Sequence, residues 1–111
     1  MRIVESKKLK GQMIIPECPG CGGFHFVNTN PQNDGPCWGF NGSFEKPTFT
    51  PSILTWVGWE EGRQTICHSF VRNGQIEFCF DSPHKLAGQT VDLPEIDTES
   101  SFYYSWEEGN Y

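Results

Sequence analysis

Two cysteines separated by two residues are the clearest chemical signal in this sequence. Cys18-Pro-Gly-Cys21-Gly has the form of a zinc knuckle, in which two thiolates grip one ion across a tight turn. Gly20 and Gly22 permit that turn because glycine adopts backbone conformations that other residues avoid. We therefore predict a metal ion here rather than a disulfide or idle thiols. A thioredoxin-type redox pair is disfavoured because no βαβ pattern surrounds the motif.

Tetrahedral zinc needs two ligands beyond the knuckle. The candidates are the other cysteines and histidines: His25, Cys37, Cys67, His68, Cys79 and His84. His25 follows the knuckle closely and can fold back from the next strand, and Cys67 can close the site from a distant hairpin. We predict a structural zinc ion held by four residues: Cys18, Cys21, His25 and Cys67. The competing interpretation of His25 is an ordinary surface histidine. For Cys37 and Cys79 we prefer small buried hydrophobic residues over metal ligands.

A hairpin is predicted around Asn73-Gly74, because Asn-Gly between two alternating runs is the strongest short-range turn signal. Pairing Arg72 with Gln75 sets His68 across from Cys79. One face of the hairpin then looks like core and carries Val71, Ile76, Phe78 and Phe80. The other face is more polar and carries His68, Phe70, Glu77, Cys79 and Asp81. A slip of one residue would exchange the two faces.

A possible catalytic cluster lies near the open end of this hairpin. His68 and Asp81 are diagonal neighbours on one face, close enough for the carboxylate to orient the imidazole. Ser82 follows where the strand ends, and a serine beside an oriented histidine has the features of an activated nucleophile. His84 offers a second imidazole. The competing interpretation makes Ser82 a helix N-cap before Pro83. Ser52 is expected to be a turn residue rather than a nucleophile.

The elements that must position these residues are short strands. Glycine and proline break the chain into pieces, and the aromatic residues favour strands over leucine-rich helices. The expected strands are 2–9, 12–15, 24–28, 37–40, 52–57, 64–72 and 75–80, with one helical turn at 83–87. We predict a mainly β fold, at most a small α+β, built as a compact antiparallel sheet. Residues 1–94 should form one zinc-binding domain, and 95–111 an acidic tail that is partly disordered.

Charge and composition exclude several classes of function. The net charge of −6 argues against binding to a nucleic-acid backbone, which needs clustered lysine and arginine. No apolar stretch is long enough for a membrane span, and the first residues lack the pattern of a signal peptide. Five cysteines, an odd number, fit thiols or metal ligands better than disulfides. We therefore expect a protein of a cytoplasmic, reducing compartment.

Five runs in the same order resemble one family of small phage and bacterial proteins. They are Cys18-Pro-Gly-Cys21-Gly, Trp38-Gly-Phe40-Asn41-Gly42, Pro47-Thr-Phe-Thr-Pro51-Ser52, Cys67-His68-Ser-Phe70 and Asp81-Ser82-Pro-His84-Lys-Leu-Ala-Gly-Gln-Thr90. The resemblance covers most of residues 18–94. Members of this family look related to serine peptidases, similar to deubiquitinases, that are encoded beside bacterial ubiquitin-like conjugation systems.

Together with the zinc site predicted above, the resemblance implies a zinc-stabilised serine peptidase that removes a ubiquitin-like protein from a target lysine, in the cytoplasm of a bacterium or a phage-infected host. Ser82 would attack the carbonyl, with His68 as the base and Asp81 or His84 orienting it. Four aromatic residues could line a groove for the extended tail of the ubiquitin-like protein: Trp38, Phe40, Trp56 and Trp59. The alternative is a non-catalytic zinc-binding accessory protein of a phage, acting through protein–protein contacts.

Overall fold

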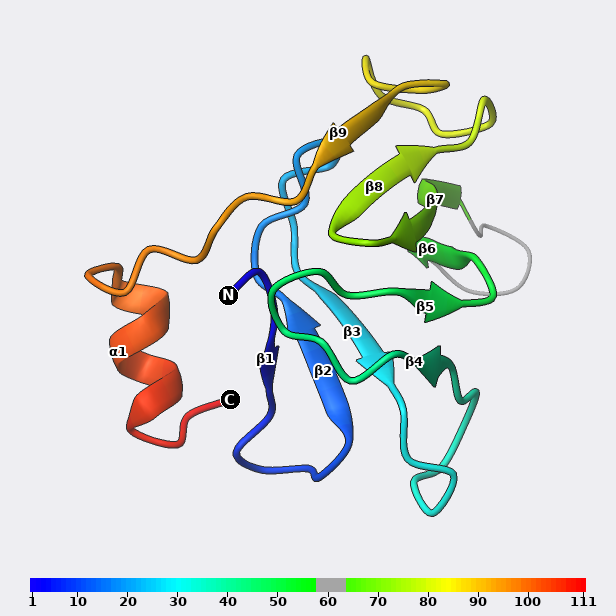
Figure 1. The fold of residues 1–111 in the computed structure, drawn as a ribbon. Coiled ribbons are helices and arrows are strands. Elements are labelled where there is room, and N and C mark those ends of the chain that lie inside the picture. The colour runs from blue at the N-terminus through cyan, green and yellow to red at the C-terminus, as the bar shows by residue number, and fades with distance from the viewer. Residues whose placement is uncertain (58–63) are drawn as a thin grey trace.

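The fold is mainly β, as the sequence predicts. A computed structural model describes residues 1–57 and 64–111, which form the elements drawn in Figure 1. The strands are β1 (Val4–Glu5), β2 (Gln12–Ile15), β3 (His25–Asn28), β4 (Gly39–Phe40), β5 (Phe49–Thr50), β6 (Ile53–Val57), β7 (Gln64–Arg72), β8 (Gln75–Phe78) and β9 (Thr90–Asp92), and the helix is α1 (Ser101–Glu107). Within the described residues, no helical segment has the length and apolarity of a membrane span.

In the described part of the chain, the strands form three antiparallel sheets rather than one. Their orders are β1-β2-β3, β4-β5 and β6-β7-β8-β9. The bounds of β2 and β7 are those predicted. The short strands β5 and β9 lie outside the predicted set. The segment 83–87 makes hydrogen-bonded turns instead of regular helix, with the Ala87 N–H donating to the carbonyl of His84 at 3.2 Å.

The hairpin of β7 and β8 has the predicted register. Arg72 pairs with Gln75 across the turn, whose residues Asn73 and Gly74 have positive φ angles of 50° and 79°. Beyond the end of β8, the Cys79 N–H donates to the carbonyl of His68 at 2.8 Å, which places these two residues opposite each other. The polar face of the hairpin is therefore the face that carries His68.

Phe80 is the exception on the predicted core face. Its side chain is 89% exposed, whereas Val71, Ile76 and Phe78 are buried. The alternation stops because β8 ends at Phe78 and the chain then turns. The Phe80 ring lies over Gly88, where an added Cβ would stand 2.5 Å from a ring carbon. The assignment of Phe80 to the core was therefore wrong.

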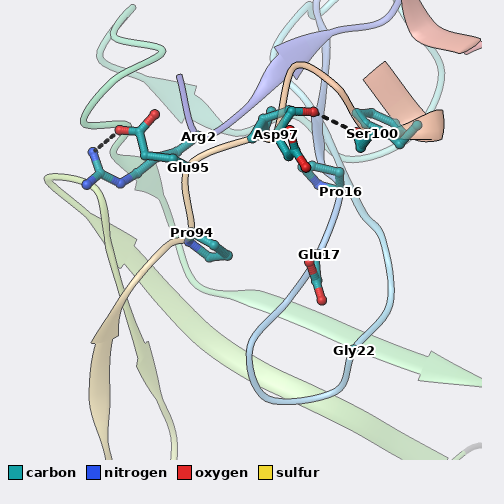
Figure 2. Close-up of a pocket in the computed structure, with 10 residues that line it drawn as sticks. Arg2, Pro16, Glu17, Gly22, Pro94, Glu95, Asp97 and Ser100 are labelled. Carbon is teal, nitrogen blue, oxygen red and sulfur yellow. Dashed lines mark hydrogen bonds and ion pairs between the residues drawn. The ribbon is translucent and has the colours of Figure 1, made fainter. Parts of the chain in front are cut away.

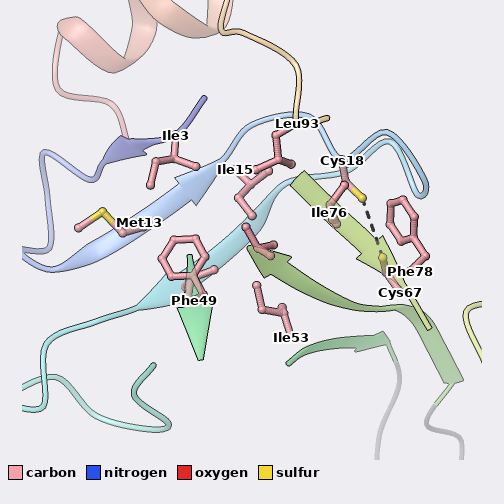
Figure 3. Packing of buried hydrophobic residues seen from close by; sticks show 12 residues of the cluster. Ile3, Met13, Ile15, Cys18, Phe49, Ile53, Cys67, Ile76, Phe78 and Leu93 are labelled. Carbon is pink, nitrogen blue, oxygen red and sulfur yellow. Dashed lines mark hydrogen bonds between the residues drawn. The ribbon is translucent and has the colours of Figure 1, made fainter. Parts of the chain in front are cut away.

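One apolar core joins the sheets, and it contains two of the predicted metal ligands. Figure 3 shows this core between β2, β3, β7 and β8, with Cys18 and Cys67 at one side. Its buried members are Ile3, Met13, Ile15, Cys18, Val27, Phe49, Ile53, Cys67, Val71, Ile76, Phe78 and Leu93. Trp38 and Phe40, two of the predicted groove residues, pack against it and are half-buried.

The predicted acidic tail contains helix α1, which lies beside β1 at the edge of the β1-β2-β3 sheet (Figure 1). The indole Nε1 of Trp106 donates to the carbonyl of Glu5 at 2.7 Å. The ring of Phe102 lies 5.4 Å from that of Phe24. These aromatic contacts give the segment a fixed place, although it carries acidic charge. The domain division at residue 94 stays a prediction.

The segment between β9 and α1 borders a pocket of about 280 Å³ (Figure 2). Arg2 forms an ion pair with Glu95 at 3.6 Å, and the Ser100 hydroxyl donates to the Asp97 carbonyl at 2.7 Å. Glu17, which precedes the knuckle, also lines this pocket. The described lining residues include Gly22 of the knuckle but none of the predicted metal ligands or catalytic residues.

Candidate active site and metal centre

His68 lies with its imidazole between a carboxylate and a hydroxyl. Its Nδ1 is 3.0 and 3.1 Å from the two carboxylate oxygens of Asp81, and its Nε2 is 3.1 Å from the Oγ of Ser52. With Nδ1–H donating to Asp81, Nε2 is left to accept the Ser52 hydroxyl proton. Serine, imidazole and carboxylate in this order form the constellation of a serine hydrolase.

The sheet β6-β7-β8-β9 brings these three residues together. Ser52 directly precedes β6, and the pairing of β6 with β7 sets Leu54 opposite His68. The carbonyl of Ser52 also accepts a hydrogen bond from Trp38 Nε1 at 3.2 Å, which fixes the backbone at this point. Asp81 lies in the turn that follows β8. The three side chains therefore come from three separate parts of the chain.

Ser82 lies beside the cluster, but its hydroxyl is engaged elsewhere. It is buried, donates to the His68 carbonyl at 2.8 Å and accepts from the His68 N–H at 3.0 Å. Among the described residues, the hydrogen bonds of Ser82 Oγ reach neither an imidazole nitrogen nor the N–H of Lys85. Ser82 therefore acts neither as a partner of the histidine ring nor as a helix cap. It ties the turn after β8 to β7.

Ser52 is the member of the serine–histidine–aspartate cluster that the sequence did not predict. Pro51-Ser52 was interpreted as a turn, and Ser52 does precede a strand. The pairing register of β6 with β7 would have predicted its position. Leu54 lies opposite His68, and this pairing brings Ser52 to the same end of the sheet. That alignment includes a bulge between Thr55 and Trp56. A bulge shifts the pairing by one residue, so the alternation of side chains alone does not predict it.

His84 lies against the predicted metal ligands and away from Ser52. Its Nδ1 accepts the N–H of Leu86 at 3.3 Å, so its hydrogen sits on Nε2, which faces the Sγ of Cys67 at 3.5 Å. Its ring also packs edge-on against Phe78, at 4.5 Å between ring centres. His84 is thus placed to hydrogen-bond a thiolate.

The structure brings together the four predicted metal ligands. The ligand atoms of Cys18, Cys21, His25 and Cys67 all lie within 4.8 Å of one another. The Sγ atoms of Cys18 and Cys67 are 3.9 Å apart, and Cys21 Sγ is 3.4 Å from His25 Nε2. Ligand atoms on a tetrahedral zinc ion stand about 3.5–3.8 Å apart. Three sulfurs and one nitrogen at these distances fit a metal ion.

The surroundings of the cluster hold its members in place. Cys18 and Cys67 are buried in the core, and His25 is buried at the start of β3. The Nδ1 of His25 is 2.8 Å from the Thr55 hydroxyl, which leaves Nε2 directed at the sulfurs. Gly22, with a φ of 78°, closes the knuckle by donating its N–H to the Cys18 carbonyl at 2.8 Å. Such second contacts orient metal ligands.

One family model matches residues 1–79 of this 111-residue chain. It is described as the bacterial ubiquitination-like system serine protease, BubE. The chain belongs to the BubE family. The matched residues include the cysteine–histidine cluster, Ser52 and His68, whereas Asp81 lies just beyond them. Neither the curated proteins nor the solved structures gave a match.

The family confirms the resemblance that the five sequence runs indicate. The description of BubE names a serine protease within a bacterial ubiquitination-like system, which supports hydrolase chemistry for this chain. The structure supplies the serine, histidine and carboxylate that such chemistry needs.

The thiols of this BubE member are electrostatically coupled. The hydrogen bond from Cys67, followed by smaller contributions from His25, lowers the pKa of Cys18 to about 3. That same bond and burial raise the pKa of Cys67, and burial also raises the pKa of Cys21. One thiolate is therefore favoured and further ones are opposed, because like charges would lie side by side. A divalent cation would stabilise all three thiolates together.

Gly20 offers a specific test of how the BubE cluster is supported. An added Cβ at Gly20 would lie 2.4 Å from His84 Cε1 and 2.8 Å from Phe78 Cε1. Gly20→Ala should therefore displace His84 from Cys67 and lower the free energy of unfolding by about 1–3 kcal/mol. Chemical denaturation and loss of metal to a competing chelator measure the two effects.

Gly23→Ala is the matched control for this substitution, because an added Cβ at Gly23 meets no described atom within 4 Å. It should leave both stability and metal retention near the wild-type values. Equal behaviour of the two variants would contradict the assigned role of His84.

Proposed function

We propose that this BubE-family protein is a zinc-stabilised serine peptidase that releases a ubiquitin-like protein from a target lysine, with Ser52 as its nucleophile. The observation that carries the proposal is the 3.1 Å contact between Ser52 Oγ and His68 Nε2, with Asp81 on the opposite ring nitrogen. The sequence predicts Ser82 as the nucleophile, whereas we assign this role to Ser52. The Ser82 hydroxyl forms hydrogen bonds with the backbone of His68 instead.

The geometry supports a two-step acyl transfer. Ser52 Oγ attacks the carbonyl carbon of the isopeptide bond while His68 Nε2 takes the hydroxyl proton. The imidazolium returns that proton to the lysine amine, which leaves, and the ubiquitin-like protein remains as an ester on Ser52. Water then attacks the ester, His68 accepts its proton, and the proton returns to Ser52. Asp81 holds the Nδ1–H tautomer and stabilises the imidazolium.

In this proposal the metal is zinc and its role is structural. Four protein ligands close a tetrahedral site, whereas a catalytic zinc keeps one position open. The cluster lies behind the active site: Cys67 is the neighbour of His68 on β7, and Thr55 on β6 contacts His25. When bound, the ion would hold together the strands that place Ser52 and His68.

An apolar hollow beside Ser52 supports a protein substrate with an extended tail. It has a volume of about 280 Å³ and is lined by Phe24, His25, Phe26, Trp38, Ile53, Leu54, Thr55 and Trp56. Leu54 is 48% exposed and lies opposite His68, so it presents an apolar side chain on the catalytic face. Of the predicted groove residues, Trp38 and Trp56 line this hollow, and Phe40 stacks on Phe49 instead. Trp59 lies outside the described residues.

A charge placed in this hollow should separate substrate binding from chemistry. Leu54→Asp should reduce kcat/KM for a ubiquitin-like conjugate by about tenfold or more, since an apolar contact is replaced by a carboxylate that must be desolvated. Labelling of Ser52 by a small fluorophosphonate should change little, because that probe does not occupy the hollow. Leu9→Asp, at an exposed leucine distant in sequence, is the control. A loss of labelling equal to the loss of cleavage would contradict the binding role.

Labelling with a fluorophosphonate, followed by peptide mass mapping, tests the proposed function directly. The adduct should appear on the peptide that carries Ser52, and the same preparation should release the ubiquitin-like protein from a lysine conjugate. An adduct on Ser82 would contradict the assignment of Ser52 and support Ser82 as the nucleophile, as predicted from the sequence. The absence of any adduct and of cleavage would favour the non-catalytic, zinc-binding accessory protein.

A further inference from the structure

A second group of metal-ligating side chains surrounds the outer side of the catalytic histidine. The ligand atoms of His68, Cys79 and Asp81 all lie within 4.8 Å of one another. The backbone holds them there, because the Cys79 N–H donates to the His68 carbonyl at 2.8 Å and Asp81 follows two residues later. The proposed reaction uses His68 and Asp81 but has no role for Cys79.

We propose that His68, Cys79 and Asp81 form an inhibitory site for a thiophilic divalent cation, with zinc as the metal that fits best. An imidazole nitrogen, a thiolate and a carboxylate oxygen are all zinc ligands, and three of them leave one position for water. The metal-binding part of this proposal is independent of the proposed peptidase function, whereas the inhibitory part rests on it.

The second cluster differs from the first in accessibility. Its members are half-buried or exposed, and the Asp81 side chain is 63% exposed. Asp81 can therefore move away from Nδ1 far enough to admit an ion between them. Glu77, on the same face of the hairpin, adds negative charge, although Arg72 pairs with it at 2.8 Å. Three ligands near solvent should bind more weakly and exchange faster than the four buried ones.

Occupation of this site would stop the proposed reaction through the protons of His68. A cation on Nδ1 needs the lone pair of that nitrogen, so the ring hydrogen must move to Nε2. The Cys79 thiol releases its proton to solvent when the sulfur binds. Nε2 then carries a hydrogen and can no longer accept the proton of Ser52. Asp81 also turns from the imidazole to the cation, and the serine loses its base.

Equilibrium dialysis of the zinc-loaded full chain against buffered free zinc tests the binding. Wild type should hold about one more zinc ion than Cys79→Ser, since the thiolate is the strongest ligand of the three. Cys37→Ser is the matched control, because Cys37 is exposed and belongs to neither cluster. Equal zinc contents in wild type and Cys79→Ser would overturn the site, as would a loss of the extra ion in Cys37→Ser.

Fluorophosphonate labelling in the same zinc series tests the inhibition. Labelling of wild type should fall as the second ion binds and return when a weak chelator removes it. In Cys79→Ser, the zinc concentration that halves labelling should rise by at least about tenfold, while labelling without added zinc stays unchanged. Unchanged labelling with the second ion bound would overturn the inhibitory role. If no labelling occurs at any zinc level, the peptidase proposal fails, and the zinc contents still decide whether the site exists.

Discussion

Ser52→Ala should abolish fluorophosphonate labelling and slow cleavage of a ubiquitin-like conjugate by at least about a thousandfold. The hydroxyl that faces His68 Nε2 at 3.1 Å is the group that would form the acyl-enzyme, and alanine offers no replacement. Zinc content and melting temperature should stay near the wild-type values, because Ser52 is not among the buried residues. Probe labelling, conjugate cleavage and elemental analysis on one preparation measure all three quantities.

Ser82→Ala is the matched comparison, since both serines lie close to His68. The buried Ser82 hydroxyl makes two hydrogen bonds to the His68 backbone, so its removal should cost about 1–3 kcal/mol of unfolding free energy. Labelling by the probe should persist. The opposite pattern, with labelling lost in Ser82→Ala and kept in Ser52→Ala, would return the nucleophile to Ser82.

Removal of the metal should have the largest effect on the fold. Structural zinc contributes an apparent binding free energy of about 10–16 kcal/mol, which matches or exceeds the whole stability of a small protein. Cys18→Ser, or a strong chelator, should therefore abolish cooperative unfolding. Circular dichroism and elemental analysis test this, with about one tightly bound zinc expected per wild-type chain.

Cys37→Ser is the control and should leave both readouts unchanged, because Cys37 is exposed outside the cluster. Wild-type protein without zinc, purified in the absence of chelator, would contradict the proposal.

The time course of chelation separates a structural from a catalytic metal. Labelling of Ser52 and the circular dichroism signal should decay together, because the cluster and the proposed active site share strands β6 and β7. Immediate loss of labelling with an intact fold would instead indicate that the ion takes part in the reaction.

The sequence predicts the elements whose signals are local. The knuckle, with one later histidine and one distant cysteine, is sufficient to predict the cluster that the structure assembles. Asn73-Gly74 is sufficient to predict the register of β7 and β8, and through it the contact of His68 with Asp81. In both cases a short turn restricts which residues can meet.

The features that the sequence misses depend on longer-range packing. Ser52 reaches His68 through the bulged pairing of β6 with β7. Helix α1 has seven residues and buries none of them fully, so it is too short to show a periodic apolar pattern in the sequence. It is held by side-chain contacts such as the hydrogen bond from Trp106 to the carbonyl of Glu5 and the ring contact of Phe102 with Phe24. Cys37 was expected to be buried, but lies exposed just before β4.

Cys67 and His68 are consecutive residues of β7 that face opposite sides of the sheet. The first faces the buried cluster, and the second faces Ser52. A slip of one residue would exchange these faces, so a strand in the wrong register loses a metal ligand and the proposed base together. Bound metal would therefore mark the molecules in which β7, the strand of the proposed base, has its correct register. The fraction of molecules in a preparation that retain zinc should equal the fraction with a correctly placed histidine.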